Sequence, residues 1–178
     1  MILVVAATER ELAGAGDTPT LVCGIGPIEA AATTARALTV QQPEAVLHVG
    51  IAGARGIPAA ELVIGSESIY EDAAEGGLVT LRVVPDTKLL EAARRAIPEA
   101  RVCPIGTSAR VGGTSGCAVE AMEGFAVLRA AALAGIPAVE VRAVSNEIDE
   151  PDRGLWQFEE ALAALASAVP RLLDEIRR

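Results

Sequence analysis

The segment AVEAMEGFAVLRAAALAGIPAVEVRAVSN, residues 118–146, gives the clearest indication of the fold class. Its first part is rich in Ala and Leu and predicts a helix over Val119–Ala134, with Gly135 as a natural C-terminal stop. Its second part is rich in valine and predicts a strand over Ala138–Ser145 that turns polar where it ends. A helix followed directly by a strand is one unit of an alternating α/β arrangement.

The flanking sequence continues this alternation on both sides of the segment. Further helices are predicted over Ile28–Val40, Thr87–Ala96 and Leu155–Ile176. Further strands are predicted over Ile2–Ala7, Thr20–Cys23, Ala45–Val49, Leu62–Tyr70, Leu78–Val83 and Arg101–Ile105. Pro27 suits a first helical turn because its φ is already fixed, and Asp86 is a natural N-cap. We therefore expect a single α/β domain over residues 1–178, with a central mixed sheet flanked by helices.

Composition and charge predict a folded protein that binds neither nucleic acid nor membranes. Hydrophobic residues make up 51% of the chain and charged residues 22%, as in ordinary globular proteins. The net charge of -9 opposes contact with a phosphate backbone, and an aromatic content of 2% offers little for base stacking. The apolar stretches are shorter than the roughly 20 residues of a membrane span. The opening MILVVAATERE is typical of a first strand and not of a signal peptide.

Cysteine, histidine and glycine patterns favour a structural interpretation over a metal or cofactor site. The three cysteines have no CxxC spacing, so we expect neither a disulfide framework nor a zinc site, and a cytoplasmic location. His48 is the only histidine, and on a strand it is more often a hydrogen-bonded structural residue than a catalyst. Gly24–Glu29 has two glycines of a dinucleotide fingerprint, but Glu29 stands where a third small residue belongs.

Three polar segments at the ends of predicted elements are the candidates for chemistry. Met122 and Glu123 fall in the first turns of the predicted helix, where a carboxylate also favours the positive end of the helix dipole. Asn146 ends a strand and predicts either a ligand-binding amide or an Asx turn. Thr8–Glu11 places two carboxylates after a strand, as a site or merely as a helix start. The local patterns leave both interpretations open in each case.

Taken together and in order, these segments resemble the purine nucleoside phosphorylase and nucleosidase superfamily. The branch they resemble most is that of the methylthioadenosine/S-adenosylhomocysteine nucleosidases and, within that neighbourhood, the futalosine hydrolase family. The matching segments are AATEREL (6–12), GIGPIEAA (24–31), VGIAGA (49–54), VIGSESIYEDA (63–73), AVEAMEGFAVLRAA (118–131) and AVEVRAVSN (138–146). The combination of MEG with VRAVSN is specific, whereas GIG or VGIAG alone is not. The resemblance implies the phosphorylase-type fold and cleavage of a purine nucleoside.

The resemblance also implies a role for each matching position. Glu11 corresponds to the carboxylate that activates the attacking water, and Glu123 to the one that grips the ribose hydroxyls. Met122 is expected to pack on the sugar, and Asn146 to contact the purine and help it leave. The other expected contacts are a loop beside the ribose formed by Ile51, Ala52 and Gly53, and backbone at the base edge contributed by Val111. No metal or organic cofactor is implied, and a homo-oligomer, a dimer or larger, is expected.

Departures from the family pattern indicate the substrate and the reaction. The methylthioadenosine-type enzymes carry Asp where this chain has Asn146, and an amide pairs better with a 6-oxo group than with a 6-amino group. Hypoxanthine is therefore the expected base and futalosine the expected substrate, which places the reaction in menaquinone biosynthesis. Glu11 would repel phosphate and favours hydrolysis, although Arg55 and Arg110 leave phosphorolysis open. The alternatives are an adenine-type nucleosidase, a purine phosphorylase, and a catalytically silent nucleoside-binding protein.

Overall fold

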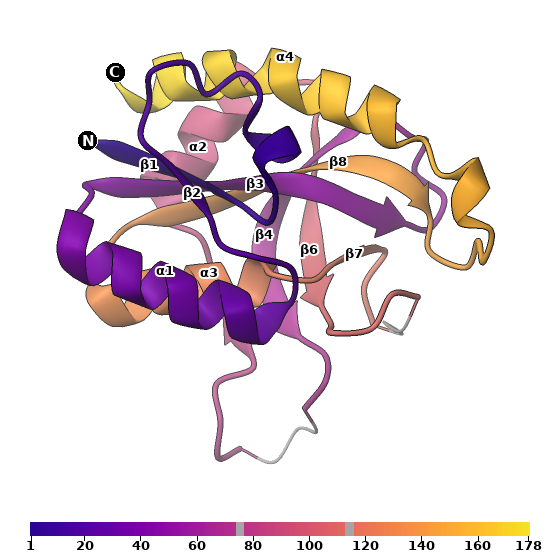
Figure 1. Cartoon of the computed structure of the whole chain (residues 1–178), viewed down its shortest axis with the longest axis horizontal. Helices are drawn as coiled ribbons and strands as arrows, with labels where there is room; N and C mark the ends of the chain where they lie inside the picture. The colour runs from indigo at the N-terminus through magenta and orange to yellow at the C-terminus, as the bar shows by residue number, and fades with distance from the viewer. Residues whose placement is uncertain (74–76, 113–115) are drawn as a thin grey trace.

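The computed structural model describes residues 1–73, 77–112 and 116–178. Figure 1 shows a sheet between two pairs of helices, with α2 and α4 over one face and α1 and α3 over the other. The strands are β1 (Ile2–Ala6), β2 (Thr20–Val22), β3 (Ala45–Ala54), β4 (Leu62–Tyr70), β5 (Arg82–Val83), β6 (Arg101–Thr107), β7 (Val119–Ala121) and β8 (Ala138–Glu147). The helices are α1 (Pro27–Gln41), α2 (Thr87–Ala96), α3 (Gly124–Ala134) and α4 (Phe158–Ile176), with short 3₁₀ turns η1 (Glu9–Leu12) and η2 (Arg153–Leu155).

The mixed sheet curls until part of it closes on itself. Strand β3 pairs in parallel with β8, β8 pairs antiparallel with β4, and β4 pairs in parallel with β6. Strand β6 then pairs in parallel with β7, and β7 returns antiparallel to β3. The strands β1 and β2 extend the sheet in parallel beyond β3. The expected central mixed sheet is confirmed, and its closure into a ring of five strands is an additional feature.

Alternation along the strands divides the apolar core between the two faces of the sheet. In β1, Ile2, Val4 and Ala6 pack into the cluster that includes Leu89 of α2 and Leu165 of α4. The intervening Leu3 and Val5 pack into a second cluster with helices α1 and α3. This two-sided burial is what the continuous apolar run at the start of the chain requires. A third cluster lies among the ring strands and contains Ala52, Ala54, Ile57, Val63, Ile105, Val119, Ala121 and Val144.

The helix predicted over Val119–Ala134 begins too early in the sequence, and this part of the prediction is wrong. Val119–Ala121 forms β7, and α3 begins only at Gly124 with Glu123 as its N-cap. Met122 and Glu123 therefore precede the helix instead of occupying its first turns. Local preference predicted a helix here, but backbone pairing of β7 with both β3 and β6 stabilises the extended conformation.

Other element boundaries also move, because long-range pairing extends or shortens the predicted strands. Strand β3 continues to Ala54 along its pairing with β8, so Ile51, Ala52 and Gly53 lie in a strand and not in a loop. Strand β8 likewise extends to Glu147 and includes Asn146. The predicted strand Leu78–Val83 is reduced to Arg82–Val83, and the last helix begins at Phe158 instead of Leu155.

The predicted helix ends are confirmed where a specific residue determines them. Pro27 is the first residue of α1, and the Asp86 carboxylate caps α2 by accepting from the backbone N–H groups of Lys88 and Leu89. Gly135 ends α3 with a φ of 70°. Among the described residues no helix combines the length and the apolar character needed to cross a membrane.

Candidate active site

The candidate site lies where the parallel strands β2, β1, β3 and β8 approach their carboxyl ends. Glu11 follows β1, Gly26 follows β2, and Gly50–Gly53 occupy the second half of β3. Arg142 and Asn146 come from the second half of β8, and Glu123 enters from the turn between β7 and α3. Ligands of parallel α/β sheets bind at such strand ends. The sequence also predicts that most of these segments follow a strand or end one.

Glu11 is buried and held by three hydrogen bonds. Its Oε2 accepts from the Thr8 backbone N–H at 2.9 Å and from Thr8 Oγ1 at 2.8 Å. Its Oε1 accepts from the Ile51 backbone N–H at 3.0 Å, which joins η1 to β3. Donors on both oxygens hold the carboxylate in a single orientation, as the proposed role of activating a water molecule requires.

Glu123 is the second buried carboxylate of the site. Its Oε1 accepts from the Gly26 backbone N–H at 3.0 Å, and Gly26 has a φ of 96° that favours glycine. Burial raises the pKa of Glu123, while nearby Arg142 and the bond from Gly26 lower it, and Glu11 and Glu140 raise it further. The charged form of Glu123 is thus lost at a higher pH than that of a solvated glutamate.

A buried arginine joins the two carboxylates. Arg142 is fully buried, and its Nη1 lies 3.6 Å from Glu123 Oε2. A Cβ added to Gly50 would lie 2.2 Å from Arg142 Nη1 and 2.8 Å from Glu11 Oε1, so both side chains meet over this glycine. The guanidinium therefore lies near both Glu11 and Glu123, and its charge offsets their repulsion. Gly50 is required because any side chain would displace one of them.

Sequence reasoning missed Arg142 although a signal was present. The run Val139-Glu140-Val141-Arg142 places two charged residues at alternate positions of a strand otherwise made of apolar residues. Alternate residues share one face of a strand, and buried charges need partners. That pattern predicts a buried ion pair, and the structure places Arg142 Nε 2.8 Å from Glu140 Oε1.

Asn146 lies beside Gly53 at an irregularity in the sheet. The pairing of β3 with β8 shifts register between Ala52 and Gly53, which brings Asn146 opposite Gly53. The Asn146 side-chain oxygen accepts from Ser145 Oγ at 2.7 Å, and its Nδ2 donates to the Glu147 carbonyl at 2.9 Å. An amide has two hydrogens and two oxygen lone pairs, so it can bind a ligand while these bonds persist. The bulge thus directs an oriented amide, as bulges near active sites often do.

The other residues predicted to contact the substrate differ in how deeply they are buried. Ala52 is buried, whereas Ile51, Gly53 and Met122 are half-buried beside the carboxylates or Asn146. Val111 is 45% exposed in a turn, and its expected contact with the base edge stays a prediction.

His48 is fully buried and has a partner on each ring nitrogen. Its Nε2 lies 2.6 Å from Arg142 Nη2, and its Nδ1 lies 3.0 Å from the Val5 carbonyl oxygen. A guanidinium can only donate, so Nε2 accepts and the proton is on Nδ1. Burial and the Arg142 charge hold the pKa of His48 well below its usual value. The structural interpretation of this histidine is confirmed.

We expect His48 to remain neutral in the folded protein at pH values where a solvated imidazole is charged. The ring nitrogens of a single histidine give an unambiguous pair of ¹⁵N NMR signals, and these should report a protonated Nδ1 and an unprotonated Nε2. The urea-unfolded chain is the control and should titrate near the ordinary value of about 6.5. A ring that takes up a proton in that range while the protein stays folded would contradict the assignment.

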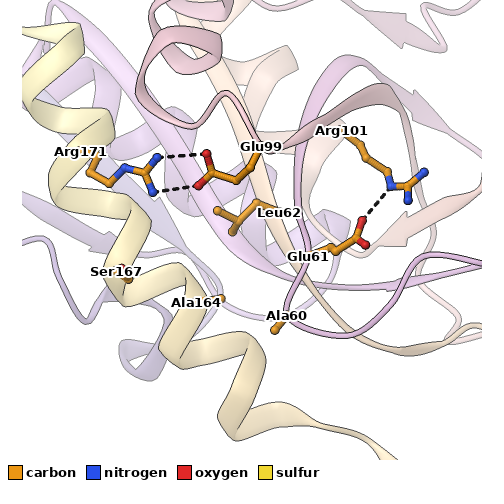
Figure 2. A pocket seen from close by; sticks show the side chains of 8 residues that line it. All are labelled: Ala60, Glu61, Leu62, Glu99, Arg101, Ala164, Ser167 and Arg171. Atoms are coloured by element: carbon orange, nitrogen blue, oxygen red, sulfur yellow. Dashed lines mark hydrogen bonds and ion pairs between the residues drawn. The ribbon is translucent and has the colours of Figure 1, made fainter.

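The cavity in Figure 2 is separate from this centre. It has a volume of about 640 Å³ and is bordered by two ion pairs, Glu61–Arg101 and Glu99–Arg171. Its wall includes Leu62, which belongs to the core under α2 and α4, whereas Arg142 alternates to the opposite face of β8. Exposed ion pairs of this kind contribute little to stability, and none of the predicted site residues lines the cavity.

Comparison with known proteins connects these residues to one family. The family model described as the phosphorylase superfamily matches residues 11–178. The futalosine hydrolase of Streptomyces coelicolor is 36% identical in an alignment that is 181 residues long with its gaps and that covers 85% of this chain and 77% of that protein. The futalosine hydrolase of Thermus thermophilus is 47% identical over 60 residues, which cover 34% of this chain and 27% of that protein.

Solved structures of low sequence identity share the fold. The methylthioadenosine/S-adenosylhomocysteine nucleosidase of Neisseria meningitidis superimposes with a TM-score of 0.84 at 22% identity, covering 99% of this chain and 97% of that one. The native futalosine hydrolase of Helicobacter pylori superimposes with a TM-score of 0.87 at 15% identity, covering 98% and 97%. The predicted phosphorylase-type fold is confirmed.

Proposed function

The chain belongs to the phosphorylase superfamily, and from that premise we propose that it hydrolyses the N-glycosidic bond of futalosine and releases hypoxanthine. The observation that carries the proposal is the placement of two buried carboxylates around one buried guanidinium, in a chain whose curated relatives are futalosine hydrolases. Arg142 meets Glu11 over Gly50 and lies 3.6 Å from Glu123. The activity is that of a nucleosidase, and it belongs to the futalosine route of menaquinone biosynthesis.

The site residues supply what the reaction needs. Cleavage leaves positive charge on the ribose and moves the electrons of the C–N bond onto the purine. Glu11 polarises a water molecule, whose oxygen bonds to the anomeric carbon as its proton passes to the carboxylate. Glu123 accepts hydrogen bonds from ribose hydroxyls and fixes the ring. Asn146 donates to the 6-oxo group of the base, and this bond strengthens as negative charge grows on the leaving purine.

Charge at the site favours water over phosphate as the nucleophile. Phosphate would approach Glu11 and Glu123 within a cluster that contains one guanidinium, Arg142, which already contacts carboxylates. Arg55 donates to Asp149 at 3.2 Å and to the Cys117 carbonyl at 3.1 Å, and Arg110 is exposed. A phosphorylase would need cations directed at the anion instead.

A homo-oligomer in the cytoplasm is the proposed state of the enzyme. Ile25 and Ile28 are 62% and 78% exposed, and they flank Gly26, whose N–H binds Glu123. A second copy that covers these side chains would also shield the ribose end of the site. Light scattering coupled to gel filtration measures the mass, and a monomer would contradict the proposed assembly.

The test of the proposed function is base release from futalosine, aminofutalosine, inosine and methylthioadenosine, each with and without phosphate. We expect release of hypoxanthine from futalosine at a rate that phosphate does not change. Adenine release from methylthioadenosine would identify an adenine-type nucleosidase, and a strict need for phosphate would identify a phosphorylase. Binding of futalosine without any base release would support the catalytically silent binder.

A further inference from the structure

We propose that Glu140 and His48 are positioning residues that hold the Arg142 guanidinium back from Glu123, so that Glu123 stays available to the ribose hydroxyls. The inference rests on the proposed function, because it assigns a task to the groups beneath that same site. Neither residue lies at the surface that a nucleoside would contact, since both are fully buried.

Glu140 is fixed in place on three sides. It lies two residues before Arg142 on β8, so both side chains leave the same face of the strand. Its Oε1 accepts from Arg142 Nε at 2.8 Å, and its Oε2 accepts from Ser68 Oγ of β4. A Cβ added to Gly124 would lie 2.2 Å from Glu140 Oε1, so the start of α3 closes over the carboxylate. The acceptor for Arg142 is therefore rigid.

The three nitrogens of the Arg142 guanidinium point in two directions. Nε bonds Glu140 and Nη2 bonds His48, and both partners lie beneath the site. Nη1 faces the site, where the Ile51 carbonyl lies at 3.5 Å and Glu123 Oε2 at 3.6 Å. Charge-assisted hydrogen bonds normally measure about 2.7–2.9 Å. Glu123 is therefore within ion-pair distance of Arg142 but forms no hydrogen bond with it.

The rigid partners prevent a competing ion pair. A guanidinium strongly favours a direct, often bidentate, contact with a carboxylate. If Arg142 were free to turn, Glu123 would be the nearest alternative partner, and a direct pair would occupy the oxygen that the ribose needs. Glu140 accepts a hydrogen bond from Arg142 Nε on the side away from the site. His48 accepts one from Arg142 Nη2 without adding a positive charge.

The decisive variant is Glu140→Gln, which keeps an acceptor for Arg142 Nε and a donor for Ser68 but removes the charge. Arg142 should then pair more closely with Glu123, and kcat/KM for futalosine should fall about 10-fold, mainly through a higher KM. Loss of the Glu140 charge and the closer guanidinium both lower the pKa of Glu123. The acid limb of the kcat/KM profile, where Glu123 takes up a proton, should therefore move to lower pH. An unmoved acid limb overturns the proposal.

A matched control and a second variant separate positioning from simple packing. Glu99→Gln removes the same charge from the exposed pair with Arg171, in the cavity of Figure 2, and should leave rate and pH profile unchanged. His48→Gln places an amide oxygen near the position of Nε2, whereas His48→Asn keeps only a group near Nδ1. The glutamine variant should retain several-fold more kcat/KM than the asparagine variant. Equal losses would show that His48 only fills space.

A readout without turnover distinguishes this inference from the proposed function. The pKa of Glu123 can be followed by ¹³C NMR in the parent and in His48→Asn, which releases Arg142 Nη2 without removing a charge, with no substrate present. A lower pKa in the variant supports the positioning role even if the parent releases no base, which would refute the proposed function alone. If the parent releases hypoxanthine but the pKa of Glu123 does not fall in the variant, the positioning role alone is refuted.

Discussion

Replacement of Glu11 by glutamine is expected to lower the rate of hypoxanthine release from futalosine by about 100-fold to 10,000-fold, the usual contribution of general-base catalysis. The amide is close in size to the carboxylate but cannot take a proton from water. Binding should change little, because Glu123 and Asn146 are the proposed contacts of the ribose and the base. Single-turnover base release measures the rate, and calorimetry with a non-hydrolysable nucleoside measures binding.

Glu11→Gln is also expected to lower the free energy of unfolding, so the experiment needs a control for stability. Glu11 accepts from Thr8 on one oxygen and from Ile51 on the other, and an amide NH₂ would face one of these donors. An unpaired buried donor costs roughly 1–3 kcal/mol of unfolding free energy. Thr8→Val removes one of these bonds and leaves the carboxylate, so it should lower stability while keeping turnover within about 10-fold of the parent. Retention of parental turnover in Glu11→Gln would refute the catalytic role.

Much of the fold could be predicted from the sequence because local signals and tertiary structure agree along most of it. The continuous apolar run of β1 requires burial on both faces, and Asp86 and Gly135 determine helix ends by their own chemistry. Val119–Ala121 is the exception, because its extended state depends on β3 and β6, which are distant in sequence. Closure of the sheet into a ring is invisible to local patterns for the same reason.

The candidate site was predictable only where a residue's role depends on neighbours close to it in the sequence. The spacing of Thr8 and Glu11 is that of a capping box, which explains why this glutamate is oriented before any ligand binds. Glu140 and Arg142 were visible as alternating charges, but their partners Ser68, His48 and Glu123 come from other elements. Sequence patterns indicate that a buried charge needs a partner without saying which residue provides it.

Replacement of Asn146 by aspartate is expected to reduce kcat/KM for futalosine by about 100-fold to 1,000-fold, the loss typical for one donor to a developing anion. The bonds from Ser145 Oγ and to the Glu147 carbonyl fix which end of the side chain is the oxygen and which is the nitrogen. An aspartate oxygen would replace Nδ2 and face the Glu147 carbonyl, 2.9 Å from the present nitrogen. Two acceptors repel at that distance, so the new carboxyl should favour its protonated form and have a raised pKa.

A protonated aspartate that turns its O–H from the Glu147 carbonyl toward the base can donate to the ring nitrogen of an adenine, which an amide cannot protonate. Activity of Asn146→Asp toward methylthioadenosine should therefore appear, and it should increase as pH falls through the pKa of the new carboxyl. Asn146→Leu fills similar space with no hydrogen-bonding group and should lose both activities. Base release from futalosine and methylthioadenosine across pH measures all three proteins. If the aspartate and leucine variants lose the same activity toward both nucleosides, Asn146 does not read the base, and the preference for hypoxanthine must come from another residue.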